Sequence, residues 1–167
     1  MTGHSLVPRE EAFLRRAIEL AREARAMGRH PFGSLIVDAS GEVVVEAHNN
    51  AVRPAGDPTQ HAETLACAAA AKLMPEAELA GCTLYTSTEP CAMCAGAIYW
   101  VGIGRVVYAL PEKGLLGYTG SHNENPTLDL PCREVFARGQ RPTIVEGPFL
   151  EAEAGRVHEG FWTQKQL

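Results

Sequence analysis

A strand, a helix and a second strand follow one another between residues 83 and 110, and this unit limits the fold more than any other feature of the chain. Residues 83–88 and 105–110 are short runs rich in apolar and β-branched residues, and residues 91–101 between them are predicted to be helical. Two strands joined in this way by a helix run parallel, with a right-handed crossover. The chain is therefore expected to be an α/β protein whose sheet contains a parallel pair.

A β-hairpin is expected to extend this sheet. Residues 34–38 and 42–47 form two apolar, β-branched runs that are separated by the turn segment Ala39-Ser40-Gly41. The runs are nearly continuous in apolar residues rather than alternating, which indicates a sheet that is covered on both faces. Because a hairpin is antiparallel, the complete sheet is expected to be mixed.

Helices are expected on either side of the hairpin in sequence. Residues 61–74 contain an alanine-rich stretch and stop before Pro75, which cannot continue a helix. A further helix near the N-terminus is predicted to end at Gly28, because apolar residues recur before it at steps of four and three. These residues mark the buried face of that helix: Phe13, Ala17, Leu20, Ala24 and Met27.

The remaining segments complete the plan. Residues 1–8 are expected to be a mobile leader, and residues 111–130 carry no clear period, which is typical of a lid or specificity loop. A short helix at 133–138, a strand at 143–146 and a helix near 149–162 close the chain. The expected architecture is one domain over residues 1–167, a three-layer α/β/α sandwich with a mixed central sheet.

Composition excludes several classes of protein. Of the 167 residues, 46% are hydrophobic, which is too many for a chain that is mainly disordered. No apolar stretch approaches the ~20 residues that span a bilayer, and a net charge of −5 disfavours a broad nucleic-acid-binding surface. The five cysteines are an odd number in a chain without an apparent export signal, so a reducing, cytoplasmic compartment is expected.

Two predicted helix starts carry side chains that bind metal. His61 opens one helix, and the motif Pro90-Cys91-Ala92-Met93-Cys94 opens the other. Cysteines three residues apart place both sulfurs on one face of the first turn, where the helix N-terminus favours thiolates. Two thiolates and one imidazole make three protein ligands for Zn²⁺ and leave the fourth position to water, as in catalytic zinc sites. Glu63 lies on the same helix turn as His61 and is expected to exchange protons with that water.

A purely structural zinc site is the alternative interpretation of these residues, and it requires a fourth protein ligand. The spare thiols are poorly placed for that role. Cys67 is six residues past His61, and Cys82 and Cys132 lie at the edges of predicted elements. All three are expected to be small core or boundary residues.

Three motifs in this order resemble the cytidine-deaminase-like superfamily, in particular its nucleobase and tRNA-adenosine deaminase branch: residues 57–63, 84–94 and 96–100. His-x-Glu followed by Pro-Cys-x-x-Cys is the signature of zinc deaminases. The resemblance extends from the first helix through Leu110, and it implies the cytidine-deaminase-like fold with bound Zn²⁺. It also implies hydrolytic deamination, in which water adds to an amidine carbon of a heterocycle, Glu63 protonates the leaving amine and ammonia departs.

The same resemblance implies substrate-binding roles for four further residues, each with a structural alternative. Asn49 is expected to hydrogen-bond a base carbonyl, although His48-Asn49-Asn50 is also ordinary turn chemistry. Phe32 is expected either to stack on a base or to open a buried strand, and Trp100 either to wall the pocket or to fill the core. Glu124 is expected to contact a purine as a second carboxylate, or else to be a solvated loop residue. The remaining histidines are expected at the surface or in turns: His4, His30, His48, His122 and His158.

Several functions remain open at this point. Guanine is the first expected substrate, because residues 57–63 and 96–100 resemble bacterial guanine deaminases most, and cytosine or another aminated base is the second. Adenosine at the wobble position of a tRNA is the third: residues 102–107 resemble that branch, but the last predicted helix is acidic rather than basic. A zinc-binding interaction module without catalysis is the remaining class.

An association between copies of the chain is also expected by resemblance, since related deaminases associate and can share pocket residues. A homodimer is the expected state. The candidate interface segments are the apolar stretch 91–104 and the aromatic pair Phe161-Trp162.

Overall fold

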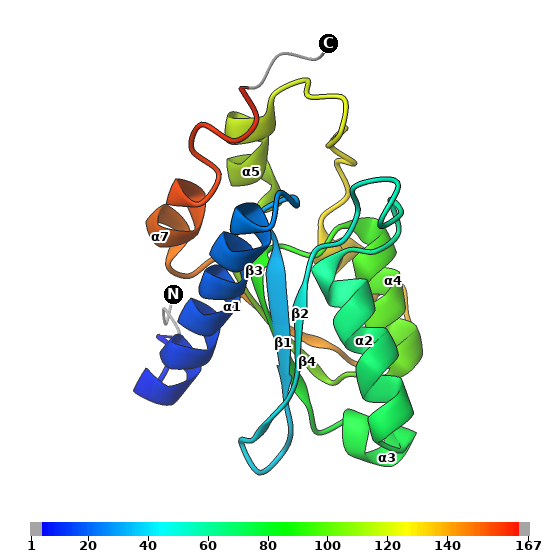
Figure 1. The fold of residues 1–167 in the computed structure, drawn as a ribbon. Coiled ribbons are helices and arrows are strands. Elements are labelled where there is room, and N and C mark those ends of the chain that lie inside the picture. Colours follow the sequence, from blue (N-terminus) through cyan, green and yellow to red (C-terminus); the bar gives the residue numbers. More distant parts are fainter. Residues whose placement is uncertain (1–4, 164–167) are drawn as a thin grey trace.

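A mixed five-stranded sheet forms the centre of the computed structural model, which describes residues 5–163 (Figure 1). The strands lie in the order β2-β1-β3-β4-β5. Pairing is antiparallel between β1 and β2 and between β1 and β3, and parallel from β3 to β4 and from β4 to β5. The bounds are β1 Gly33–Val37, β2 Val43–His48, β3 Thr83–Thr88, β4 Arg105–Leu110 and β5 Ile144–Glu146.

Helices cover both faces of this sheet, which confirms the three-layer α/β/α arrangement (Figure 1). Each face has its own hydrophobic cluster: Leu14 and Leu35 belong to one, and Ile36 and Ile98 belong to the other. On the first face lie α1 Pro8–Ala26, α5 Glu112–Thr119 and α7 Glu151–Arg156. On the second lie α2 Ala62–Leu73, α3 Glu76–Leu79, α4 Ala92–Val101 and α6 Cys132–Ala137.

The predicted hairpin and β-α-β unit are both present. In the hairpin, β1 is buried along its whole length, as the continuous apolar run indicates, whereas β2 is an edge strand with exposed positions. In the β-α-β unit, β3 and β4 run parallel, with Thr83 opposite Arg105 and Thr88 opposite Leu110. The carboxyl ends of these two neighbouring strands therefore lie at the same edge of the sheet.

The expectation of an irregular segment over residues 111–130 is wrong in its first half, where α5 forms. This helix has no clear apolar periodicity, because it contains two glycines and only two buried residues, Leu115 and Thr119. Contacts that are distant in sequence support the helix instead: α5 packs against α7, where the Tyr118 ring covers Gly155. The irregular part is confined to residues 120–131.

Smaller corrections apply near the ends of the chain. Met27 is exposed, so the buried face of α1 continues only through Ala24. The last helix is shorter than the expected 149–162, because it ends at Arg156 and residues 157–163 form turns. Of the leader expected at 1–8, residues 1–4 lie outside the described part, and Pro8 already begins α1. Within residues 5–163, no helix is both long and apolar enough to cross a membrane.

Candidate metal centre and catalytic cavity

The starts of α2 and α4 bring three metal-binding side chains together. His61 is the N-cap residue of α2, Cys91 is the N-cap residue of α4, and Cys94 follows one turn later. The Nδ1 atom of His61 lies 3.7 Å from Sγ of Cys91 and 3.5 Å from Sγ of Cys94, and the two sulfurs are 3.6 Å apart. All three ligand atoms lie within 4.8 Å of one another. One ion can therefore contact all of them.

The electrostatics of this group suit a cation. The hydrogen-bonding contacts of Cys91 with Cys94 and His61 lower the pKa of the Cys91 thiol to about 4. The pKa of the Cys94 thiol is raised by its contact with Cys91 and by burial. Sulfur and imidazole nitrogen are ligands that zinc prefers. In the described chain, no fourth cysteine, histidine or carboxylate belongs to the group. This donor set therefore fits the three-ligand pattern of a catalytic zinc site.

The spare cysteines are buried elsewhere, as expected. Cys67 and Cys82 belong to the hydrophobic cluster beneath α2 and α4, and Cys132 opens α6 in the same cluster. Burial raises the pKa of the Cys67 thiol and of the Cys132 thiol to about 12 in each case. Such thiols remain protonated, which suits core residues rather than ligands.

Glu63 is held beside the metal group by the sheet. Its side chain is only 5% exposed. Its Oε1 atom accepts a hydrogen bond of 2.9 Å from the Thr86 hydroxyl, which itself accepts one of 2.9 Å from Ser34. Its other oxygen, Oε2, lies 3.6 Å from Sγ of Cys94. Burial raises the pKa of this carboxyl group, so the group holds a proton more readily than a carboxylate in water does.

Two adjoining cavities open onto these residues. The catalytic cavity has a volume of about 300 Å³ and includes His61, Glu63 and Cys91 in its wall. A side cavity of about 470 Å³ includes His30 and Asn49. The two cavities adjoin, because they share six lining residues: Phe32, Pro58, His61, Glu124, Asn125 and Pro126.

Two of the predicted substrate-binding residues line these cavities and also have structural roles. Asn49 is buried in the wall of the side cavity, and its Oδ1 atom accepts a hydrogen bond of 2.8 Å from the Ala51 backbone N–H. Phe32 lines both cavities, and behind it lie the rings of His158 and Trp162 at centroid distances of 5.2 and 6.2 Å. Each of these two residues therefore has a structural role and also forms part of a cavity wall.

Trp100 does not wall either cavity of this chain. Its side chain is 77% exposed. The residue lies near the C-terminal end of α4, whereas the metal group lies at the N-terminal end of the same helix. Nine helical steps separate Cys91 from Trp100, a displacement of ~13 Å along the axis. The expectation that Trp100 contributes to the pocket or to the core is corrected accordingly.

Glu124 lies in the loop with its side chain 60% exposed, as the solvated alternative expects, but it also lines the cavities and has a side-chain partner. It lines both cavities, and its Oε2 atom forms a hydrogen bond of 2.8 Å with Nε2 of His30. The placement of His30 at the surface or in a turn is wrong, since this histidine is buried. His158 is buried as well, where it accepts a hydrogen bond from Trp162, and burial lowers its pKa to about 3. The contact of His30 with Glu124 joins residues 94 positions apart, so spacing alone gives no sign of it. His158 and Trp162 are only four residues apart, and their contact lies within the segment expected to be the last helix.

Two further carboxylates near the metal group have no role assigned from the sequence. The side chain of Glu89 is buried and accepts hydrogen bonds from the backbone N–H groups of Glu112, at 3.0 Å, and Cys132, at 3.1 Å. It thereby joins the starts of α5 and α6 to the turn that carries Cys91. Glu112 lines the catalytic cavity directly. The sequence does contain a sign of this role for Glu112. The residue comes shortly after a predicted parallel strand, and side chains at the carboxyl ends of such strands face a common crevice.

Comparisons with known proteins agree with this geometry. Residues 8–110 match the family model of the cytidine and deoxycytidylate deaminase zinc-binding region. Over 162 residues the chain is 43% identical to a probable cytosine deaminase of Schizosaccharomyces pombe, covering 97% of this chain and 98% of that protein. Over 127 residues it is 40% identical to a tRNA-specific adenosine deaminase of Haemophilus influenzae, covering 72% and 73%. A guanine deaminase structure from Nitrosomonas europaea aligns with a TM-score of 0.73 at 26% identity, covering 96% of this chain and 87% of that one.

Replacement of Cys91 or Cys94 by alanine should remove bound zinc, because two protein ligands hold the ion far less tightly than three. The matched control is Cys67→Ala, which removes a buried thiol outside the metal group. Elemental analysis of the purified proteins should find zinc in the wild type and in the control but not in the two ligand variants. An unchanged zinc content in both ligand variants would show that the ion is held elsewhere.

Proposed function

This chain belongs to the family of the cytidine and deoxycytidylate deaminase zinc-binding region, and on that premise we propose that it hydrolyses the amino group of a free nucleobase and releases ammonia. The observation that carries the proposal is the common cavity of His61, Cys91 and Glu63, in which three zinc-binding atoms and one buried carboxyl group meet. A structural zinc site has no need of a buried carboxyl group at its open side. The non-catalytic interaction module is therefore the weaker candidate.

The proposed mechanism assigns proton transfer to Glu63. Zinc, when bound, lowers the pKa of a coordinated water molecule to about 7 and so supplies a nucleophile at neutral pH. Glu63 would take one proton from the attacking water and deliver it to a ring nitrogen of the substrate. It would then pass the second proton, from the newly added hydroxyl group, to the amino group, which leaves as ammonia. Its raised pKa suits this role, because a proton carrier works best when its pKa is near the working pH. Thr86 holds Oε1, so Oε2 is the oxygen that faces the reaction.

The cavity walls are proposed to position the base. Asn49 offers its amide NH₂ group to a ring carbonyl, because its Oδ1 atom is already engaged by Ala51. Phe32 offers an aromatic face between the two cavities. Glu124 contributes as a fixed carboxylate, since its hydrogen bond with His30 holds the loop over the cavities.

Guanine is our first candidate substrate and cytosine the second. The side cavity adjoins the catalytic cavity and offers space for the second ring of a purine. The likeness to a guanine deaminase structure supports the same choice. Cytosine is supported by a different observation: the likeness to a probable cytosine deaminase runs over 162 residues and so includes the part of the chain after Leu110.

An RNA substrate is disfavoured by the charges at the cavities. The charged side chains that line them are Glu63, Glu89, Glu112, Glu124 and Arg53. A phosphate backbone gains most of its affinity from lysine and arginine, so a mouth dominated by carboxylates repels it. The net charge of −5 acts in the same direction.

The five free cysteines support our proposal of a reducing, cytoplasmic environment.

Replacement of Glu63 by glutamine should keep the zinc and lower kcat by a factor of at least about 10²–10⁴, because the amide fills the same space but cannot take up and release a proton. The control is Glu78→Gln, an exposed position on α3, which should leave kcat unchanged. Ammonia release and zinc content are measured on the same samples. Full activity of the Glu63→Gln enzyme would remove this residue from the mechanism.

The zinc-loaded protein should release ammonia from free guanine, or from cytosine, and should leave RNA unchanged. The panel includes adenine, isocytosine, aminotriazines and the corresponding nucleosides, together with a tRNA whose wobble base is adenosine. Ammonia release and conversion of adenosine to inosine are the two readouts. Inosine at the wobble position, without turnover of any free base, would overturn the substrate proposal and leave the zinc chemistry intact.

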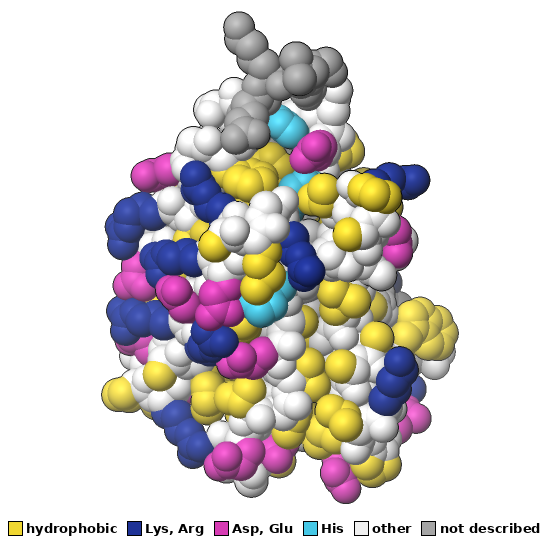
Figure 2. Space-filling view, viewed as in Figure 1, with side chains coloured by type: hydrophobic (Ala, Val, Ile, Leu, Met, Phe, Trp, Pro, Cys, Tyr) yellow, Lys and Arg dark blue, Asp and Glu magenta, His cyan; other side chains and the backbone are white. Residues whose placement is uncertain are grey.

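We also propose a homodimer that buries the exposed apolar side chains of α4. Met93 and Trp100 on this helix are exposed. Hydrophobic side chains gather over the layer of α2, α3 and α4, whereas charged side chains gather over α1 (Figure 2). An exposed tryptophan beside other apolar groups is typical of an interface between proteins.

Replacement of Trp100 by glutamate should convert the dimer into a monomer, because a carboxylate would have to be buried in the apolar contact. The control is Val7→Glu, an exposed apolar position at the start of α1, on the opposite face of the sheet. Light scattering should report twice the 18.0 kDa chain mass for the wild type and the control. A monomeric wild type at micromolar concentration would contradict the proposal.

A further inference from the structure

We propose that Glu112, together with the hydroxyl groups of Thr88 and Thr127, determines substrate specificity by accepting hydrogen bonds from ring N–H groups of the base. The inference rests on the proposed function and adds to it a second recognition surface, on the side of the cavity formed by the start of α5. It predicts that the enzyme selects free bases over derivatives in which a ring nitrogen carries carbon.

The position of Glu112 is set by the metal-binding turn itself. Glu112 is the first residue of α5, directly after Pro111 at the end of β4. Its backbone N–H donates to the carboxylate of Glu89, which stands two residues before Cys91. This hydrogen bond ties the start of α5, and with it Glu112, to the segment that carries the metal ligand Cys91.

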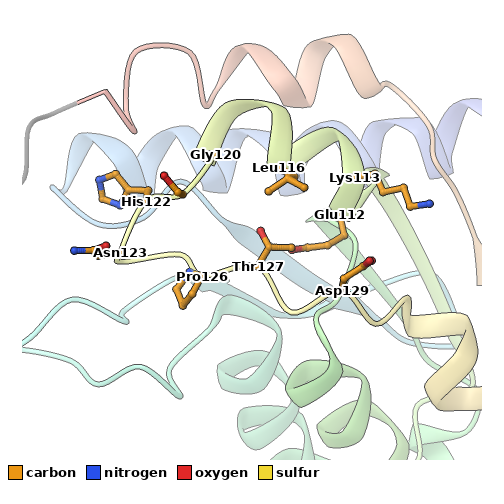
Figure 3. A pocket seen from close by; sticks show the side chains of 10 residues that line it. Glu112, Lys113, Leu116, Gly120, His122, Asn123, Pro126, Thr127 and Asp129 are labelled. Atoms are coloured by element: carbon orange, nitrogen blue, oxygen red, sulfur yellow. The ribbon is translucent and has the colours of Figure 1, made fainter.

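The side chain of Glu112 lies between two spaces. It lines the catalytic cavity and also an outer cavity of about 910 Å³ on the other side of the 120–131 loop. From α5 it extends toward Thr127, which comes from that loop and lines the same two cavities (Figure 3). Lys113, the nearest basic residue in sequence, points away from it (Figure 3).

The carboxyl group of Glu112 has no protein partner among residues 5–163: no hydrogen bond or ion pair to it is formed there. Burial, and the negative charges of Cys91, Glu89 and Glu63, raise its pKa to about 7. A half-buried carboxylate surrounded by acidic groups is costly unless a donor reaches it. N–H groups of a bound base would be such donors.

Two hydroxyl groups in the same cavity are also unpaired. Oγ1 of Thr88 and Oγ1 of Thr127 are buried and find no hydrogen-bond partner within the described chain. Thr88 is 2% exposed, and both residues line the catalytic cavity. A buried polar group that lacks its partner costs about 1–3 kcal/mol. Three such oxygen groups around one small cavity are complementary to a ligand with several polar ring atoms.

The chemistry of the three groups defines what they recognise. An ionised carboxylate can only accept hydrogen bonds, whereas a threonine hydroxyl both donates and accepts. In its ionised form, Glu112 therefore requires an N–H group on the substrate, and the hydroxyls tolerate either an N–H group or a ring nitrogen. Methylation or glycosylation of that ring nitrogen would leave the carboxylate without a donor. Sites of this kind reject the analogue strongly, because the polar group then stays unpaired.

The test compares each free base with its singly N-methylated forms. Guanine is measured against 1-, 7- and 9-methylguanine, and cytosine against 1-methylcytosine. For at least one pair, the wild-type kcat/KM should be about 10²-fold higher for the unmethylated base than for its methylated form. This ratio is smaller than the discrimination of about 10⁴-fold that fully buried recognition sites reach. The Glu112→Ala enzyme should lose most of this preference. Glu112→Gln should keep part of it, because the amide oxygen still accepts.

Two further variants separate recognition from a general structural effect. Thr127→Val removes one hydroxyl without a change of shape and should lower the same ratio several-fold, which keeps the proposal testable if Glu112→Ala does not fold. Lys113→Gln is the matched control, because Lys113 lies next in sequence but does not line the catalytic cavity. Zinc content should be unchanged in all four variants.

The outcomes distinguish this inference from the proposed function. Turnover of a free base with the same N–H to N-methyl ratio in the wild type, Glu112→Gln and Thr127→Val overturns the inference alone. Equal losses on every substrate, with a lowered melting temperature, assign Glu112 a structural role and also overturn it. No turnover of any free base by the zinc-loaded wild type overturns the proposed function and this inference together.

Discussion

The parallel pairing of β3 with β4 is the contact on which the rest of the site depends. Thr88 and Leu110 end the two strands side by side, and the Glu89 N–H donates to the Leu110 carbonyl at 2.8 Å immediately beyond. The next residues on one strand carry Cys91 into α4, and the next on the other carry Glu112 into α5. A shift in register between β3 and β4 would therefore move a metal ligand and a cavity wall relative to each other.

A chain of buried side-chain hydrogen bonds runs through the sheet to the opposite side of the cavity. Ser34 on β1 and Thr86 on β3 form a buried hydrogen-bonded pair that ends on Glu63 of α2. In a region of low dielectric constant, such a chain is favourable only when every member has its partner. The hairpin strand, the parallel strand and the metal-binding helix are thus positioned by one set of polar contacts. This explains how a carboxyl group can be buried beside two sulfurs without disrupting the core.

The metal group and the sheet could be predicted from the sequence because both depend on local spacing. His61, Cys91 and Cys94 each open a helix or lie in its first turn, and helix starts are readable from proline and from apolar periodicity. Contacts between distant segments could not be read in this way. The helix α5 packs against α7, and the buried His158 packs against the rings of Phe32 and Tyr118. The exposed position of Trp100 could not be predicted, because apolar character alone does not indicate whether the end of a helix faces the core or solvent.

The wall behind Phe32 has a consequence for the order in which the protein is made. Its rings come from His158 and Trp162, near the end of the described chain, whereas the metal group is complete once Cys94 has been added. Domains are synthesised from the N-terminus at about 5–20 residues per second. The interval between Cys94 and Trp162 is therefore several seconds, during which the ligands exist while one side of the cavity is still missing. The residues of the metal group are therefore synthesised well before the residues that close the wall behind Phe32.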